Sequence, residues 1–325
     1  MDAKTKRALF AGAGAVGALY ATRWAIRYSR RFDFDRSVAL ITGGSRGLGL
    51  EIARVLADEG ARIAICARDE AEVNRAADDL RSRGAEVLAI QCDVTVQAQV
   101  DEMVRGVVGH FGSIDVLINN AGIIQVGPME EMRVADYDEA MKAHFYAPLF
   151  TTLAALPVMR GKGAGRIVNI SSIGGKIAVP HLLPYSASKF ALVGFSEGLR
   201  AELMKDGIYV TTVIPGLFRS GSPKHAYFKG QHRKEFAWFA ASDVLPLVSL
   251  SVTRLAKRIV KACRYGQAEL ITPMLFNLQA RLAGVMPGMT SNLGSIANRV
   301  LPAPGGIGAE ARTGAESDSY LQPEF

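Results

Sequence analysis

Hydrophobic residues along the chain form short, almost continuous runs that alternate with longer stretches of mixed hydrophobic and polar residues. The short runs are rich in β-branched residues and apolar at nearly every position, as expected of strands buried between two layers of helices. They occupy residues 38–42, 62–66, 86–92, 115–119, 166–170, 209–214 and 269–272. The stretches between them place apolar residues three and four positions apart, which is the period of amphipathic helices. Helices are therefore predicted over residues 47–59, 70–83, 96–111, 136–160, 185–206 and 253–264.

This alternation of strand and helix predicts an α/β fold with a right-handed, doubly wound parallel sheet, the Rossmann type of architecture. One such domain is expected over residues 37–272, preceded by a basic, partly apolar arm over residues 1–36. Two further amphipathic stretches predict a helical extension over residues 273–301. The tail over residues 302–325 opens with Pro and Gly, continues with Ser, Thr and Glu, and is predicted to be disordered.

Composition and charge narrow the class of protein further. Of 325 residues, 49% are hydrophobic and 21% charged, which excludes a collagen-like chain, a disordered chain and a small disulfide scaffold. The formal charge is 38 − 31 = +7, and residues 1–36 carry eight Lys and Arg against three Asp, or +5. A nucleic-acid-binding face spread over the whole fold is therefore not expected. The three cysteines, Cys66, Cys92 and Cys263, lack CxxC spacing and predict a reducing, cytoplasmic environment without a metal site.

The N-terminal arm contains fifteen uncharged residues in a row between Arg7 and Arg23. As a helix they would span ~22 Å, which is shorter than the ~30 Å hydrocarbon core of a membrane. Two interpretations of residues 8–31 stay open: a weak membrane anchor whose arginines face anionic lipid, and a frayed helix in water. The GxGxxG spacing over residues 12–17 is not interpreted as a dinucleotide site, because no strand precedes it.

A glycine-rich turn, GGSRGLG over residues 43–49, directly follows the first predicted strand. Its position between a strand and a helix suits backbone N–H groups that bind phosphate. After the second strand, Ala67 stands where NAD-binding proteins usually place a carboxylate for the ribose 2′-hydroxyl. Arg68 and Arg46 are instead suited to hold a 2′-phosphate, the alternative being that both are solvated surface residues. NADP is therefore predicted in preference to NAD.

Tyr185 and Lys189 are four residues apart at the start of a predicted helix, so they share one face of it. An ammonium ~4 Å from a phenol is worth about 4 kcal/mol at an effective dielectric constant of about 20, enough to lower a tyrosine pKa from ~10 toward 7. Such a phenol can act as a general acid or base near neutral pH. Ser172 ends the strand before this helix and is expected at the same edge of the sheet, beside a substrate carbonyl oxygen.

These motifs, in this order, resemble the short-chain dehydrogenase/reductase family over residues 37–272. Residues 42–49 match its TGxxxGxG turn, residues 119–122 its NNAG segment, and Tyr185 with Lys189 its YxxxK motif. The resemblance implies that Tyr185 carries the proton, that Lys189 lowers the pKa of Tyr185 and holds the ribose, and that Ser172 polarises the substrate carbonyl. The expected cofactor-binding residues are Gly43, Ser45, Arg46, Gly47, Leu48, Gly49, Arg68, Asp93, Val94, Asn120, Ala121, Gly122, Tyr185, Lys189, Pro215, Gly216 and Ser220.

One position departs from the family pattern. The helix before the serine strand usually carries an asparagine at a kink that holds a water molecule of the proton relay, and here His144 stands in that place. Two interpretations are open. Either the backbone still holds the water and the imidazole only replaces the amide, or His144 itself joins the relay as a catalytic residue, because the histidine pKa lies near neutrality.

Residues 221–247 follow the segment expected near the nicotinamide, where this family varies its lid. Aromatic side chains are frequent there, and they either contact a bulky apolar substrate or pack the lid onto the sheet. They are Tyr227, Phe228, Phe236, Trp238 and Phe239. His181 and His225 are expected at the pocket rim or on the surface, with no metal between them.

The sequence thus predicts a cytoplasmic, NADP-dependent oxidoreductase that transfers a hydride between the nicotinamide and a carbonyl or secondary alcohol. The resemblance further implies a homo-oligomer and a small-molecule substrate. Two alternatives remain open at this point. One is a membrane-associated dehydrogenase for a lipid, steroid or retinoid-type alcohol, and the other is a non-catalytic, NADP-binding sensor or scaffold.

Overall fold

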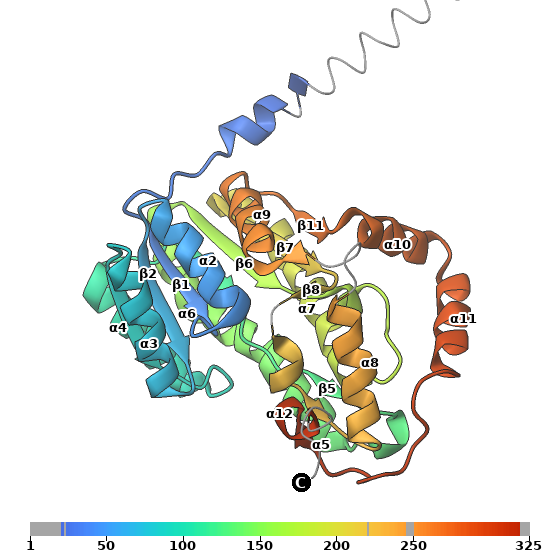
Figure 1. Ribbon diagram of the computed structural model, residues 1–325. Helices are drawn as coiled ribbons and strands as arrows, with labels where there is room; N and C mark the ends of the chain where they lie inside the picture. The colour runs from blue at the N-terminus through green and yellow to red at the C-terminus, as the bar shows by residue number, and fades with distance from the viewer. Residues whose placement is uncertain (1–20, 23, 220, 245–249, 319–325) are drawn as a thin grey trace, which may run out of the picture.

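A parallel sheet of seven strands runs through the protein in the order β11-β7-β6-β4-β1-β2-β3. The structure is a computed structural model and describes residues 21–22, 24–219, 221–244 and 250–318 (Figure 1). The predicted doubly wound sheet is confirmed, and each predicted strand is present with its ends shifted by at most one residue. The strands are β1 (Val38–Thr42), β2 (Arg62–Ala67), β3 (Val87–Gln91), β4 (Val116–Asn119), β6 (Gly165–Ile170), β7 (Ile208–Pro215) and β11 (Glu269–Thr272).

Helices cover both faces of the sheet, and the residues of β1 pack alternately against the helices on one face and on the other. Its odd-numbered residues Ala39 and Ile41 pack with α2 (Gly47–Asp58), α3 (Glu70–Ser82) and α9 (Val252–Arg264). Its even-numbered residues Val38 and Leu40 pack with α4 (Gln97–Phe111), α6 (Ala147–Lys162) and the end of α7 (Leu183–Leu203). Successive strand residues point to opposite faces. A strand that is buried on both sides is therefore apolar at nearly every position, which is why continuous apolar runs in the sequence predict these strands.

The strand order reverses at β1, which lies between β4 on one side and β2 on the other. In open parallel sheets, ligands bind at the carboxyl ends of the strands beside such a reversal. The ends of β1, β4 and β6 meet at this edge, because β1 pairs with β4 and β4 pairs with β6. The glycine turn, the NNAG segment and Ser172 directly follow these three strands and are thus brought together.

The predicted helix over residues 136–160 is divided into three parts. α5 (Val134–Met141) passes into a π-helical segment, Lys142–Tyr146, and then into α6. In the π-helical segment the Ala147 N–H donates to the Lys142 carbonyl, five residues back. Pro148 follows at the start of α6 and has no N–H to donate to the carbonyl of residue 144. The widened turn therefore occurs where a regular helix would leave that carbonyl without its partner.

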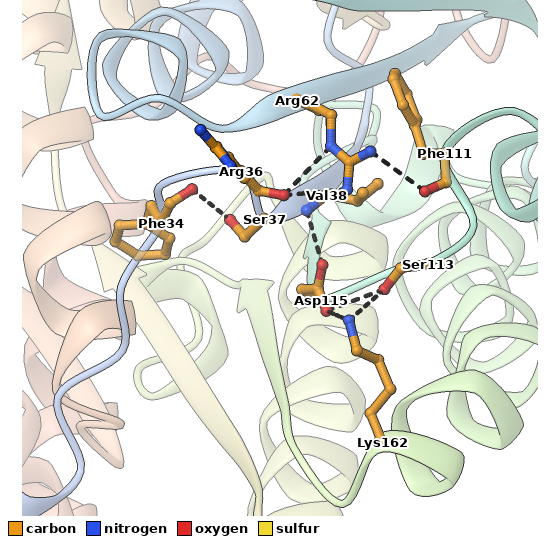
Figure 2. A network of polar contacts seen from close by, with 9 residues as sticks. All are labelled: Phe34, Arg36, Ser37, Val38, Arg62, Phe111, Ser113, Asp115 and Lys162. Carbon is orange, nitrogen blue, oxygen red and sulfur yellow. Dashed lines mark hydrogen bonds and ion pairs between the residues drawn. The ribbon is translucent and has the colours of Figure 1, made fainter.

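The amino end of β1 is fixed by Asp115, which immediately precedes β4 (Figure 2). The Asp115 carboxylate accepts the Val38 N–H at 2.8 Å and the Ser113 hydroxyl at 3.0 Å, and forms an ion pair with Lys162 of α6. Arg62, at the start of β2, donates to the Arg36 carbonyl at 3.1 Å. These contacts lie at the end of the sheet opposite the glycine turn, so they hold the strands without entering the candidate site.

The C-terminal tail folds onto the lid. β12 (Arg312–Thr313) pairs with β9 (Tyr227–Phe228), which also pairs with β5 (Gln125–Val126), and α12 (Gly314–Ser317) follows. The Gly314 N–H donates to the Ala226 carbonyl at 2.8 Å. The prediction of a disordered tail was therefore wrong for residues 302–318. Composition alone does not reveal that the backbone of a polar tail has a strand to pair with.

The remaining elements surround this frame. The predicted C-terminal helices are α10 (Met274–Val285) and α11 (Pro287–Asn298), and the lid carries α8 (His232–Val244). Short elements are β8 (Phe218–Arg219), β10 (Leu250–Ser251), and the 3-10 turns η1 (Met129–Glu131), η3 (Ile173–Gly175), η4 (Met204–Asp206) and η5 (Ser222–His225).

Most of the anchor predicted over residues 8–31 lies outside the described residues. Residues 21–22 and 24–29 are helical, and the chain then joins the body of the protein through the Arg30 carbonyl, which accepts from the Arg166 guanidinium at 2.7 Å. Among the helices of the described residues, none combines the length and the apolar character needed to cross a membrane.

Candidate active site

The glycine turn between β1 and α2 has a backbone that only glycine adopts easily. Gly43 and Gly47 have φ angles of +62° and +55°. A Cβ on Gly49 would lie 2.1 Å from the Gly43 carbonyl oxygen, so this position has no room for a side chain. No side chain caps the N-terminus of α2, and its first turn carries no acidic residue. Among the residues that the structure describes, no side chain accepts from the first N–H groups of α2, and the residues present fit a phosphate group of a dinucleotide.

The NNAG segment braces this turn. The Asn120 side-chain amide donates to the carbonyls of Thr42 and Gly43 at 3.1 and 3.0 Å. The Thr42 hydroxyl accepts the N–H groups of Asn120 and Ala121 at 3.0 and 3.1 Å. Gly122 is also required, because a Cβ there would lie 2.9 Å from His144 Nε2. The NNAG segment therefore fixes the position of the glycine turn relative to the π-helical segment.

The two arginines predicted to hold a 2′-phosphate lie in different environments. Arg46 forms an ion pair with Glu72 of α3 at 2.8 Å, and the Ser45 hydroxyl donates to the same carboxylate at 3.2 Å. Arg68 is exposed and lines, together with Asp93, an open surface hollow of about 880 Å³. Sequence reasoning missed Glu72, because its distance from the glycine turn depends on how α3 packs. A carboxylate thus stands beside Arg46 although the second strand ends without one.

The other predicted cofactor-binding residues lie at the carboxyl edge of the sheet, with one exception. Asp93 follows β3 and accepts the Thr95 N–H at 2.9 Å, while Val94 next to it is buried. Pro215 ends β7, and the Gly216 N–H that follows donates to the Thr272 carbonyl at 2.8 Å. Ser220 lies outside the described residues.

Ser172, Tyr185 and Lys189 are brought together as the spacing predicts. Ser172 follows β6, and its hydroxyl is hydrogen-bonded to that of Tyr185 in the first turn of α7. Lys189, one turn later, is 5% exposed and places its Nζ 5.7 Å from the centre of the Tyr185 ring. That ammonium donates to the Ile170 carbonyl at 2.9 Å, which ties α7 to the end of β6. The three side chains thus converge at the edge where β6 ends.

The electrostatics differ from the expectation in one respect. Burial raises the pKa of Tyr185 above its ordinary value, and the hydrogen bond with Ser172 acts in the opposite direction. Burial lowers the pKa of Lys189 to about 7. That the charge of Lys189 lowers the pKa of Tyr185 stays a prediction, while both shifts follow burial. The physical reason is desolvation, which disfavours both charged forms, the phenolate and the ammonium.

His144 is buried and both of its ring nitrogens have protein partners. Nε2 lies 3.1 Å from the Ile123 N–H, which donates to it, and Nδ1 lies 2.7 Å from the Ser188 hydroxyl. Ser188 in turn donates to the Tyr185 carbonyl at 2.9 Å. These partners assign the proton to Nδ1. Burial, and next to it the charge of Lys189, hold the pKa of His144 well below its ordinary value, so the ring is neutral near pH 7.

Both nitrogens of this neutral imidazole are already hydrogen-bonded within the protein, so neither is free to take up or pass on a proton. Of the two interpretations of His144, this geometry favours a replacement of the asparagine side chain over membership in the relay. The ring also meets that of Tyr185 edge-on, with 5.3 Å between the centres. His144 therefore contacts the catalytic tyrosine through packing and through Ser188.

The lid covers this region with a small apolar cluster. Phe228 is fully buried and meets Phe236 and Phe239 edge-on, and Tyr185 packs against the same cluster. Most of the predicted lid aromatics thus pack the lid itself. His181, expected at the rim or the surface, is instead buried, and its Nδ1 lies 2.8 Å from a Glu235 carboxylate oxygen. His225 is exposed, as expected.

Comparison with known proteins places this geometry in a family. A family profile described as short chain dehydrogenase matches residues 37–227. Among curated proteins, the chain is 40% identical over 249 residues to the granaticin polyketide synthase putative ketoacyl reductase 1 of Streptomyces violaceoruber, a match that covers 75% of this chain and 92% of the relative. It is 41% identical over 184 residues to a putative ketoacyl reductase of Streptomyces coelicolor, covering 56% of this chain and 70% of the relative.

Solved structures agree with these relatives. A short chain dehydrogenase/reductase from Burkholderia phymatum, in complex with NAD, superimposes with a TM-score of 0.74 at 25% identity, over 79% of this chain and 96% of that one. A short-chain dehydrogenase from Streptomyces avermitilis reaches a TM-score of 0.68 at 29% identity, over 81% and 97% of the two chains. The matched regions include the glycine turn, Ser172, Tyr185 and Lys189.

Proposed function

Since the chain belongs to the short-chain dehydrogenase/reductase family, and so is an NAD(P)-dependent oxidoreductase acting on CH–OH groups, we propose that it uses NADPH to reduce the carbonyl group of a bulky, apolar small molecule. The observation that carries the proposal is the convergence of the Ser172 and Tyr185 hydroxyls above buried Lys189, at the sheet edge where the strand order reverses. The ketoacyl reductase relatives support reduction as the working direction.

In the proposed reaction a bound nicotinamide supplies the hydride that adds to the carbonyl carbon. Ser172 and Tyr185 both donate hydrogen bonds to the carbonyl oxygen and orient the substrate. The electron pair of the C=O π bond moves onto that oxygen, which takes the proton of the Tyr185 hydroxyl and becomes an alcohol. Protonated Lys189 stabilises the phenolate left behind, and the phenolate recovers a proton from solvent.

His144 and Ser188 act on this reaction through position. The Ser188 hydroxyl donates to the carbonyl of Tyr185, and His144 in turn donates to Ser188. Tyr185 lies in the first turn of α7, where its backbone carbonyl and ring are held by these two side chains. We therefore assign them as positioning residues and not as proton carriers.

The preference for NADPH rests on Arg46 and Arg68. A guanidinium binds a phosphate through two parallel hydrogen bonds, and both side chains lie at least partly in solvent where a ligand can reach them. Ala67 at the end of β2 offers no carboxylate to a ribose hydroxyl. Glu72 opposes the preference, because it competes with the phosphate for Arg46.

Initial rates measured with NADPH and with NADH test the proposal. A panel of aromatic ketones, aldehydes, steroids and β-ketoacyl thioesters serves as substrate, and loss of reduced cofactor is the readout. We expect turnover with at least one class, and a kcat/KM for NADPH at least about tenfold above that for NADH. Arg46→Ala and Arg68→Ala should lower the rate with NADPH more than the rate with NADH.

Three results would contradict the proposal. Equal efficiency with the two cofactors, in the wild type and in both arginine variants, would remove the NADPH preference. Tight binding of NADPH without turnover of any substrate would support the sensor or scaffold instead. Oxidation of long-chain or steroid alcohols that outpaces every reduction would support the membrane-associated dehydrogenase.

We also propose that the protein is a homo-oligomer that pairs through α6 and α7. Large apolar side chains on these helices are exposed, among them Leu153 at 54% and Phe190 at 44%. Tyr146, which precedes α6, is 43% exposed. Analytical ultracentrifugation of the wild type and of Leu153→Glu tests this pairing, with a fall in mass expected for the variant. A wild type that sediments as a monomer would contradict it.

A further inference from the structure

Helices α10 and α11 expose nearly all of their large apolar side chains. Neither helix contains a buried residue, and Figure 1 draws both at the periphery of the molecule, outside the layers that cover the main sheet. The exposed fractions run from 40% at Leu282 to 88% at Met274. The side chains, called here the α10–α11 surface, are Met274, Leu275, Leu278, Leu282, Val285, Met286, Met289, Leu293, Ile296 and Val300.

These side chains are arranged in stripes. On α10, Met274, Leu278 and Leu282 follow one another at intervals of four residues, so they lie along one line of the helix. On α11 and its end, the interval of four from Met289 to Leu293 is followed by Ile296 three residues later. Such stripes normally face a core. Here they face outward, and an apolar area of this kind on a protein surface marks an interaction site.

The charge around this surface indicates what covers it. Residues 270–309 contain no Asp or Glu, and their only charged residues are Arg281 and Arg299, both exposed. An apolar stripe flanked by arginine and free of acid is the composition of helices that lie in the interface of an anionic bilayer. Each helix has 12 residues, about 18 Å, which suits a helix lying along a membrane rather than through it.

The N-terminal arm carries the same chemistry. Residues 3–32 contain seven Lys and Arg and no Asp or Glu. In the described part of the arm, Trp24 and Tyr28 stack at 5.4 Å and are 66% and 53% exposed, and Ile26 between them is 46% exposed. Tryptophan and tyrosine are the residues most enriched at the level of lipid headgroups. Two separate segments thus combine exposed apolar side chains with arginine.

We propose that the α10–α11 surface docks this protein onto an anionic lipid bilayer. A second copy of the chain is the other occupant that an apolar face suggests. For that role the exposed residues of α6 and α7 already offer a different surface. The basic, acid-free composition of the α10–α11 surface complements a lipid phosphate layer and not another copy of itself.

This surface begins beside the candidate active site. Phe276 of α10 packs against Gly216, which follows β7 at the carboxyl edge of the sheet; a Cβ on that glycine would lie 2.0 Å from the Phe276 ring. An apolar substrate dissolved in the bilayer would therefore leave it next to the edge of the sheet where Ser172 and Tyr185 lie. The docking itself does not depend on the proposed reaction, because lipid binding needs no cofactor.

Vesicle flotation with the full chain tests the proposal. The probes are vesicles of phosphatidylcholine alone and vesicles that contain about 30% phosphatidylglycerol. We expect the wild type to float with the anionic vesicles, and Leu278→Glu combined with Ile296→Glu to lower the partition coefficient at least tenfold. The matched control is Met129→Glu with Val134→Glu, which adds the same charge at two side chains that are 68% and 78% exposed and should float like the wild type.

Each other outcome is decisive. A wild type that does not bind anionic vesicles contradicts the proposal. A Leu278→Glu, Ile296→Glu variant that floats as well as the wild type also contradicts it, because the N-terminal arm would then be sufficient for lipid binding. If the wild type forms a dimer and does not float, and the Leu278→Glu, Ile296→Glu variant is a monomer, the α10–α11 surface instead binds a second copy of the chain. Leu278→Ser with Ile296→Ser, checked by its unfolding temperature, replaces the glutamate variant if that variant fails to fold. Flotation reads no turnover, so its failure leaves the proposed reaction standing.

Discussion

The Nδ1 atom of His144 lies 2.7 Å from the Ser188 hydroxyl, and this contact determines what the histidine can do. The Ser188 hydroxyl donates to the Tyr185 carbonyl, so it can only accept from His144. The proton of the neutral ring is therefore on Nδ1, and Nε2 is left to accept the Ile123 N–H. His144, for which the sequence left a place in a proton relay open, in this geometry supports the first turn of α7.

His144→Asn should make the protein less sensitive to acid. The folded protein holds the pKa of His144 well below 6.5, whereas the unfolded chain takes up a proton near that pH. Below about pH 6.5 the unfolded chain therefore binds more protons, and the free energy of unfolding falls as pH falls, by up to about 1.4 kcal/mol per pH unit. Urea unfolding between about pH 5 and 7 measures this slope. An identical slope in the wild type and the variant would show that His144 is not buried in its neutral form.

Lys189→Met should remove a pH dependence on the alkaline side. Burial lowers the pKa of Lys189 to about 7, against an ordinary value of 10.5 in the unfolded chain. Between these values the unfolded chain binds more protons, so the wild type should gain stability as pH rises from about 7 to 9. The methionine variant lacks this group, and its stability should rise less over the same interval. Thermal unfolding in a series of buffers is the measurement, and parallel curves for the two proteins would be inconsistent with the lowered pKa.

Glu72→Gln should strengthen the binding of NADPH. The carboxylate pairs with Arg46 at 2.8 Å and accepts from Ser45, so it occupies the guanidinium that a 2′-phosphate would use. Removing its charge frees Arg46, and we expect the Kd of NADPH to fall by up to about tenfold, with a smaller change for NADH. Glu70→Gln in the same turn of α3 is the matched control. Calorimetric titration gives the Kd of NADPH and the Kd of NADH. An equal fall in the Kd of NADH would mean that Arg46 does not bind the 2′-phosphate.

Gly314→Ala should detach the C-terminal tail from the lid. A Cβ on Gly314 would lie 1.8 Å from the Pro223 carbonyl oxygen, a distance that no relaxation of a side chain can relieve. Amide hydrogen exchange of residues 302–318 should therefore become faster, while the main sheet keeps its protection. Gly294→Ala in α11, where nothing lies within 4 Å of the added Cβ, is the control. Unchanged exchange in the Gly314 variant would show that the tail is not held where α12 places it.

The main sheet could be predicted from the sequence because its strands are buried on both faces. A run such as VALIT at residues 38–42 is apolar at its first four positions, and Thr42 and the turn residues that follow mark where it stops. The glycine turn, Ser172, Tyr185 and Lys189 could be placed as well, because parallel strands bring their carboxyl ends to one edge. Local pattern and strand order were sufficient for these features.

The features that were missed depend on contacts between distant parts of the chain. The two-residue strand Arg312–Thr313 is too short to leave a pattern, and it forms because β9 is there to pair with it. Glu72 reaches Arg46 only through the packing of α3, and His181 is buried only because α8 brings Glu235 over it. The raised pKa of Tyr185 has the same origin, since the sequence shows which charge is near but not how much water is excluded.

In the proposed reaction, the Tyr185 hydroxyl delivers the proton when a carbonyl is reduced. Tyr185→Phe removes only that hydroxyl and so shows whether it carries the proton, with Tyr265→Phe, directly after α9 at the opposite end of the sheet, as control. NADPH consumption and NADPH affinity are measured on the same samples. We predict that Tyr185→Phe lowers kcat/KM by at least about a hundredfold and leaves the Kd of NADPH within about twofold of the wild-type value. Unchanged turnover in this variant would show that the Tyr185 hydroxyl does not deliver the proton.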